Sequence, residues 1–112
     1  MNATWAKILG VVFLLFGIVG FFTGNMFVFF SINSVHNFVH ILTGLIALWV
    51  GFGSDGKNAT TFNRVFGIVY LLVAIVGFFN VGTVVDLLSL NAADNWLHLI
   101  IGVVTTVIGF WA

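Results

Sequence analysis

The second half of this 112-residue chain repeats the first half, and the repeat keeps its few polar residues. An offset of 57 places Lys7 and the apolar stretch after it on Arg64 and its successors, and an offset of 58 aligns the later parts. The later matches are Ser31 with Ser89, Asn33 with Asn91, Asn37 with Asn95, His40 with His98, Gly44 with Gly102 and Gly51 with Gly109. Because a sequence repeat indicates a repeated structural unit, we expect two similar helical hairpins.

Charged side chains are scarce in both copies. They make up 5% of the residues, against about 25% in soluble domains, and 62% of the residues are hydrophobic. A surface that faces water cannot be built from this composition, so the sequence predicts an integral membrane protein whose main partner is the lipid bilayer. The net charge is zero, which gives no reason to expect nucleic acid as a partner. The absence of cysteine excludes disulfides and thiolate metal sites.

Four apolar stretches have the length that a hydrocarbon core of about 30 Å requires. We place the transmembrane helices at 5–23, 34–52, 60–80 and 92–111. The predicted fold is therefore all-α: a four-transmembrane-helix bundle made of two tandem hairpins with the same orientation. It forms a single membrane domain over 1–112, in which repeat 1 spans 5–52, a polar loop spans 53–60 and repeat 2 spans 61–111.

The three cations predict the orientation of the bundle. With four spans, Lys7, Lys57 and Arg64 lie on one side of the membrane, and the loops 24–33 and 81–91 on the other side contain no Lys or Arg. The positive-inside rule then places both termini in the cytoplasm. Trp5, Trp49 and Trp111 are expected in the interfacial belt on that side and Trp96 in the opposite belt.

The two outer loops are unusually apolar. We expect their segments Met26–Phe30 and Val84–Leu88 to lie in the membrane interface as short helical turns, or to dock against a partner subunit. Asn33 and Asn91 have the side chain and the position of helix N-caps. Asp94, three residues after Asn91, is placed to complete a capping box.

Small residues recur along each predicted helix with steps of three, four or seven. The stripes contain Gly10, Gly17, Gly20, Gly44, Ala47 and Gly51 in the first copy and Gly67, Ala74, Gly77, Gly102, Thr105 and Gly109 in the second. Such stripes let membrane helices approach closely. His40 and His98 lie on these stripes, so we expect both side chains to face the bundle interior at equal depth, near each other across a pseudo-two-fold axis along the membrane normal.

Six polar side chains would then gather inside the bundle: His36, Asn37, His40, Asp94, Asn95 and His98. In the interpretation that we favour, they are structural: each His donates to the facing Asn or to a backbone carbonyl, Asp94 caps its helix, and no cofactor is bound. In the second, His36, His40, Asp94 and His98 hold a divalent metal ion, or His40 and His98 bind haem as axial ligands. The third is chlorophyll, quinone or proton handling at the same histidines.

No catalytic motif supports an enzymatic activity. The serines lack a G-x-S-x-G context, and no phosphate-binding, dinucleotide-binding or His-Glu-x-x-His pattern is present. We therefore expect a non-catalytic integral membrane protein, a structural or accessory subunit of a larger membrane complex or a homo-oligomer, located in the bacterial inner membrane. The alternative is a haem-, metal- or pigment-binding membrane protein that uses the intramembrane histidines.

The segments around the histidines carry a family resemblance. The elements His36-Asn37-x-x-His40-x-x-x-Gly44 and Asp94-Asn95-x-x-His98-x-x-x-Gly102 resemble the signatures of a family of small bacterial membrane proteins that is catalogued as a domain of unknown function. The resemblance covers nearly the whole chain. It implies four helices, and it implies no activity, because the family has none that can be transferred.

Overall fold

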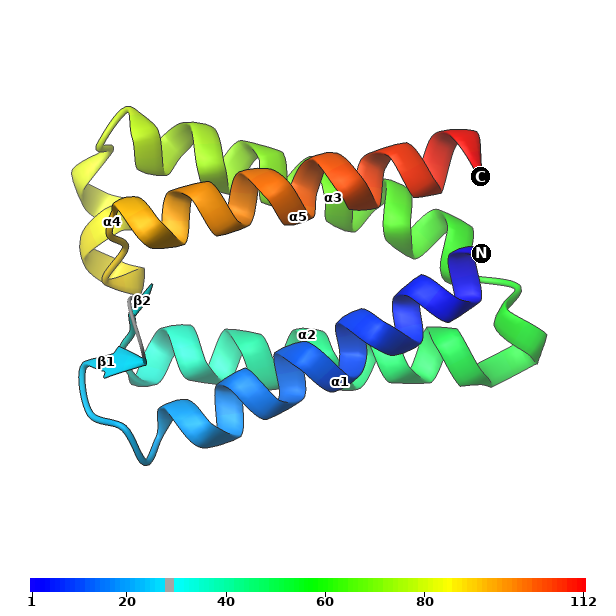
Figure 1. Ribbon diagram of the computed structural model, residues 1–112, viewed down its shortest axis with the longest axis horizontal. Coiled ribbons are helices and arrows are strands. Elements are labelled where there is room, and N and C mark those ends of the chain that lie inside the picture. The colour runs from blue at the N-terminus through cyan, green and yellow to red at the C-terminus, as the bar shows by residue number, and fades with distance from the viewer. Residues whose placement is uncertain (28–29) are drawn as a thin grey trace.

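The computed structural model describes residues 1–27 and 30–112, and its architecture is all-α (Figure 1). The long helices are α1 (Asn2–Gly20), α2 (Ser34–Phe52), α3 (Ala59–Phe78) and α5 (Ala92–Trp111). Two short strands, β1 (Met26–Phe27) and β2 (Phe30–Ser31), join α1 to α2, a 3-10 turn (Gly53–Gly56) leads to α3, and α4 (Gly82–Leu88) joins α3 to α5. All four long helices are long and apolar enough to cross a membrane, and the chain is an integral membrane protein.

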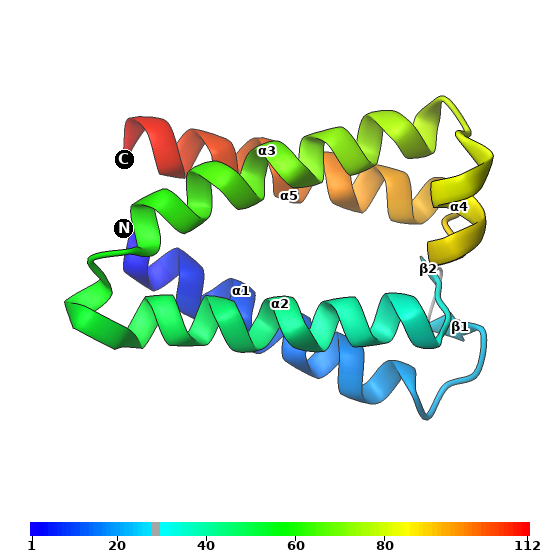
Figure 2. The same ribbon diagram turned by 180° about the vertical axis from the view of Figure 1, so that it is seen from behind.

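The helices form two hairpins with the same orientation. The pair α1 and α2 is one hairpin and the pair α3 and α5 is the other, and both views show them side by side (Figures 1 and 2). Both termini lie at one end of the bundle, while α4 and the two strands lie at the opposite end, which we call the outer end (Figure 1). The predicted bundle of two tandem hairpins is confirmed.

Glycines bring the two helices of each hairpin into backbone contact. A Cβ atom added to Gly44 would lie 2.6 Å from the backbone nitrogen of Leu14, and one added to Gly102 would lie 2.8 Å from that of Leu71. Gly44 corresponds to Gly102 in the repeat, and Leu14 corresponds to Leu71. The same close packing, which small residues permit in membranes, therefore occurs in both hairpins.

Corresponding residues also meet between the hairpins. The hydroxyl oxygens of Ser31 and Ser89 are hydrogen-bonded at 2.9 Å. The rings of Phe13 and Tyr70, which occupy matching positions of the two copies, meet edge to face with centroids 5.3 Å apart. Contact between equivalent residues marks the pseudo-two-fold axis, which runs along the bundle from the outer end toward the termini.

The helix boundaries agree with the sequence where a side chain caps the helix and differ elsewhere. The predicted bounds 34–52 and 92–111 are those of α2 and α5, whose N-caps are Asn33 and Asn91. The helix predicted at 5–23 spans 2–20, and the one predicted at 60–80 spans 59–78. Neither of these has a side-chain N-cap, and α3 ends before Asn80, whose φ of 55° is left-handed.

The two outer loops differ from each other. The second contains α4, as the expected helical turn, whereas the first pairs Met26 with Ser31 and Phe27 with Phe30 in an antiparallel ladder. The helical turn expected over Met26–Phe30 is therefore wrong, and Val28 and Phe29 lie outside the described residues. A short run rich in Phe and Val has a strong strand preference, which prevails here.

Trp5 links the two hairpins. Its indole Nε1 donates to the Thr105 hydroxyl at 2.9 Å, and its position in the interfacial belt stays a prediction. A half-buried Trp commonly finds such a partner for its N–H group. Trp49, Trp96 and Trp111 are exposed on the bundle surface, as interfacial residues are.

Candidate functional site

Two helix caps set the depth of the histidines in the bundle. The Asn33 side-chain oxygen accepts from the backbone N–H of His36 at 2.8 Å, and the Asn91 side chain accepts from that of Asp94 at 2.9 Å. These caps fix the starts of α2 and α5. Because His40 and His98 each lie seven residues after the cap, both enter the bundle two turns from the outer end.

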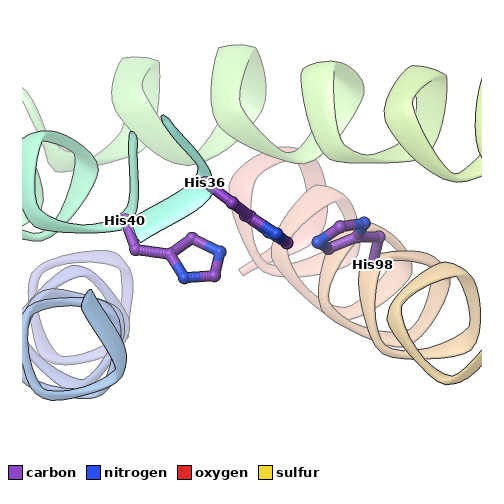
Figure 3. Close-up of side chains that lie close together, drawn as sticks. All are labelled: His36, His40 and His98. Atoms are coloured by element: carbon purple, nitrogen blue, oxygen red, sulfur yellow. The ribbon is translucent and has the colours of Figure 1, made fainter. Parts of the chain in front are cut away.

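Three imidazoles meet inside the bundle between α2 and α5 (Figure 3). His36 and His40 come from successive turns of one face of α2, and His98 comes from α5 in the other hairpin. The ring centroid of His36 lies 4.3 Å from that of His40 and 5.8 Å from that of His98. One ring nitrogen from each residue lies within 4.8 Å of the others. We call this group the histidine triad.

The triad is buried and only partly satisfied by hydrogen bonds. The residues are 2%, 6% and 3% exposed in the order His36, His40 and His98. Among the described residues, Nδ1 of His36, both nitrogens of His40 and Nδ1 of His98 have no hydrogen-bond partner. A ring nitrogen of His36 faces the backbone of Leu88 and Ser31. Buried polar atoms are normally paired, so unpaired ring nitrogens on three neighbouring histidines are unusual.

The two asparagines do not accept hydrogen bonds from the histidines among the described residues. The Asn37 side chain packs on Gly20, the equivalent Asn95 side chain packs on Gly77, and neither side-chain oxygen has a hydrogen-bond partner among the described residues. The expected bonds from His40 and His98 to these amides are therefore absent from that part of the chain. The two asparagines instead fill the space that the glycines leave open.

Asp94 is separate from the triad. Its carboxylate accepts from the backbone N–H of Asn91 at 2.9 Å, which completes a capping box at the start of α5. The capping role predicted for Asp94 is confirmed. The cluster of potential ligands found among the described residues contains His36, His40 and His98, and it does not include Asp94.

Two clefts reach the triad from opposite sides of the bundle. The larger, of about 230 Å³, lies between α2 and α3 and is lined by His36 and His98. The smaller, of about 110 Å³, lies between α1 and α5 and is lined by His40 and His98. The pseudo-two-fold axis relates them, because five lining residues of the smaller cleft, Val12, Phe13, Phe16, Leu97 and Ile101, match Val69, Tyr70, Val73, Val39 and Thr43 of the larger one.

The rings of the core separate the triad from the end of the bundle where the termini lie. Phe13, Phe66 and Tyr70 pack together with centroids 4.3 to 5.5 Å apart, and Phe13 and Tyr70 also touch the triad edge to face. Beyond them, the Asn63 amide donates to the backbone oxygen of Asn2 at 3.1 Å. Sequence reasoning missed this polar contact, although Asn63 lies on the side of α3 that carries Gly67.

Comparison with known proteins identifies a family. No curated protein and no solved structure matches the chain. A family model described as "Domain of unknown function (DUF4383)" matches residues 4–111, nearly the entire chain. The family resemblance inferred from the two histidine elements is thus confirmed, and the chain belongs to the DUF4383 family.

Proposed function

We propose that this protein binds a transition-metal ion inside the membrane through His36, His40 and His98. The observation that carries the proposal is the convergence of three buried imidazoles, whose ligand atoms lie within 4.8 Å of one another and whose nitrogens are largely unpaired. Ionisable side chains are rare within membrane spans and tend to be functional there. An ion at the centre of the triad would satisfy the nitrogens that the described residues leave without partners.

The geometry of the triad suits an ion that prefers imidazole, such as zinc, copper, nickel or iron. Zinc binds histidine nitrogen at about 2.0–2.1 Å, so nitrogens that share one ion lie roughly 3.3–3.6 Å apart. The ligand atoms of the triad lie within 4.8 Å of one another, so binding an ion requires them to approach by about 1 Å.

The dimensions of the site favour an ion over a haem or chlorophyll. Pockets that enclose drug-sized ligands measure about 300–1,000 Å³, whereas the larger cleft measures about 230 Å³. A tetrapyrrole is at least as large as such ligands and would have to separate the two hairpins. His36, which lies 4.3 Å from His40 by ring centroids, also occupies the space beside the proposed axial ligands.

Metal titration of the purified protein tests the proposal. We expect one ion per chain and protection against thermal unfolding, because an ion that binds only the folded state at 100 times its dissociation constant adds about 2.7 kcal/mol to stability. Magnesium and calcium serve as controls and should have no effect, because they prefer oxygen ligands. Elemental analysis without stoichiometric metal, together with unchanged thermal stability, would overturn the proposal.

An accessory role in a larger membrane assembly is a second proposal. The observation that favours it is the apolar surface at the outer end: Phe22 is 85% exposed and its repeat equivalent Phe79 is 79% exposed. Leu87 of α4 adds a third exposed apolar side chain there. Purification from native membranes in mild detergent should then yield a second chain at constant stoichiometry. A monomer without such a chain contradicts this role.

We further propose that both termini lie in the cytoplasm and that the membrane is the bacterial inner membrane. The starts of α1 and α3 and the connection between α2 and α3 lie at the end of the bundle that carries the termini (Figure 1). These segments contain Lys7, Lys57 and Arg64, and the positive-inside rule places such an end in the cytoplasm. In intact cells, an impermeant thiol reagent should label the variant Asn80→Cys and should not label Asn2→Cys. The reverse pattern would show the opposite orientation.

A further inference from the structure

The larger cleft joins exposed side chains of the bundle to the triad. Its lining includes Val65 and Val69, which are exposed, and the buried residues His36 and His98. Apart from the two histidines, its described lining is apolar except for Thr43 and Tyr70. The described lining contains no charged side chain that could pair with a charged ligand. Only an uncharged molecule can therefore enter the cleft from the lipid phase without a large free-energy penalty.

The smaller cleft shows what would close this path. At matching positions, the larger cleft has Val73 and Thr43 where the smaller cleft has the bulkier Phe16 and Ile101. Both differences leave more space in the larger cleft, which measures about 230 Å³ against about 110 Å³ for the smaller one. One approach to the triad is thus wide and its counterpart is partly filled by side chains.

Three protein ligands leave an ion with a free coordination position. Ions held by three protein ligands keep a fourth position for water or substrate, whereas fully enclosed structural sites use four protein ligands. The inner end of the larger cleft lies beside two of the three ligands, His36 and His98. A molecule in that cleft is consequently placed to reach the free position.

From this arrangement we propose that the α2–α3 cleft admits a small, uncharged, lipid-soluble molecule from the bilayer to the free coordination position of the bound ion. The inference rests on the proposed function in its last step, whereas binding in the cleft itself does not require the ion. An apolar cavity of about 150 Å³ can hold benzene or xenon, so a cleft of about 230 Å³ accommodates a diatomic gas or a molecule of one ring.

The two repeat copies supply matched variants for the test. Val73→Phe introduces the residue of the smaller cleft into the larger one, and Thr43→Ile does the same at a second position should Val73→Phe fail to fold. Phe16→Val is the control, because it makes the reverse change in the other cleft. The probes are xenon, followed by ¹²⁹Xe NMR on the metal-free protein, and carbon monoxide, followed by infrared spectroscopy on the copper(I)-loaded protein.

We expect saturable xenon binding and a carbon monoxide band in the unaltered protein. Val73→Phe should lower xenon occupancy and slow carbon monoxide uptake by about tenfold or more, because the added ring fills the cleft. Its copper stoichiometry should stay unchanged, and Phe16→Val should bind both gases at least as well as the unaltered protein.

Several results would overturn the inference, and they differ from a failure of the metal proposal. Carbon monoxide uptake unaffected by Val73→Phe and Thr43→Ile would show that the ligand enters by another path. Nuclear Overhauser contacts between lipid acyl chains and Val73, with xenon excluded, would show that lipid fills the cleft. If copper does not bind but xenon binding responds to Val73→Phe, the metal proposal fails and the cleft remains a binding site for small apolar molecules.

Discussion

Replacing His40 by phenylalanine is expected to abolish tight metal binding and, at the same time, to stabilise the metal-free protein. Both nitrogens of His40 are buried without a hydrogen-bond partner among the described residues, and an unsatisfied buried polar group costs about 1–3 kcal/mol. Phenylalanine is also a flat aromatic side chain, only one ring atom larger than imidazole, and would keep the edge-to-face contact that His40 makes with Phe13 at 5.2 Å. A gain in stability on loss of a polar side chain is a common sign of a functional site.

The loss of affinity should exceed about 10–100-fold, because that range applies to groups that only support a metal ligand, and His40 is proposed as a ligand itself. Isothermal titration with zinc or nickel measures the affinity, and thermal unfolding without metal measures the stability. Asp94→Asn is the control: it keeps an oxygen that can accept from Asn91, and its carboxylate is not part of the triad. Full metal affinity in His40→Phe, or marked destabilisation of the metal-free variant, would support a purely structural histidine.

Gly44→Val is expected to destabilise the first hairpin strongly. The new Cβ would lie 2.6 Å from the backbone nitrogen of Leu14 and 2.9 Å from the backbone oxygen of Gly10, so α1 would have to move away from α2. Overpacking of a well-packed interior destabilises by about 1–3 kcal/mol, and contact with backbone, which cannot rotate away, places this site at the upper end. Unfolding by sodium dodecyl sulfate in mixed micelles, followed by tryptophan fluorescence, measures the effect.

The second hairpin and α4 provide the comparisons for this prediction. Gly102→Val should have a similar effect, since its Cβ would lie 2.8 Å from the backbone nitrogen of Leu71. Gly82→Val should be nearly neutral, because the nearest atom, a carboxylate oxygen of Asp86, is 4.0 Å away. If all three variants unfold at the same detergent concentration, close packing at the glycines does not hold the hairpins together.

The fold could be predicted from the sequence largely because a bilayer restricts the choices. Four stretches of about 20 apolar residues permit little besides four spanning helices. The starts of α2 and α5 were predicted correctly, because Asn33 and Asn91 are strong capping residues. The bounds of α1 and α3 differ by one to three residues from the predicted 5–23 and 60–80, since apolar sequence continues past both helices and the turn at Asn80 depends on the local backbone.

The site could be predicted only in part. The repeat and the stripes of small residues indicated that His40 and His98 face inward at equal depth, and the structure brings them together with His36. Each His was expected to donate to the facing Asn or to a backbone carbonyl. Among the described residues, Asn37 and Asn95 accept no such bond, whereas His36 faces the backbone of Leu88 and Ser31, because helical spacing gives the face of a side chain and not its rotamer. The unequal clefts depend on side-chain volumes in three dimensions, so no pattern in the sequence revealed them.

The hydrogen-bonded pair Ser31 and Ser89 places equivalent residues of the two repeat copies in contact. If the hairpins were two identical chains paired about the same axis, every substitution would appear on both sides of that axis. A single polypeptide that carries both copies is free of this constraint. Its halves can differ, as Phe16 differs from Val73 and His36 differs from Asp94. A nearly symmetric bundle can in this way hold a site that is not symmetric.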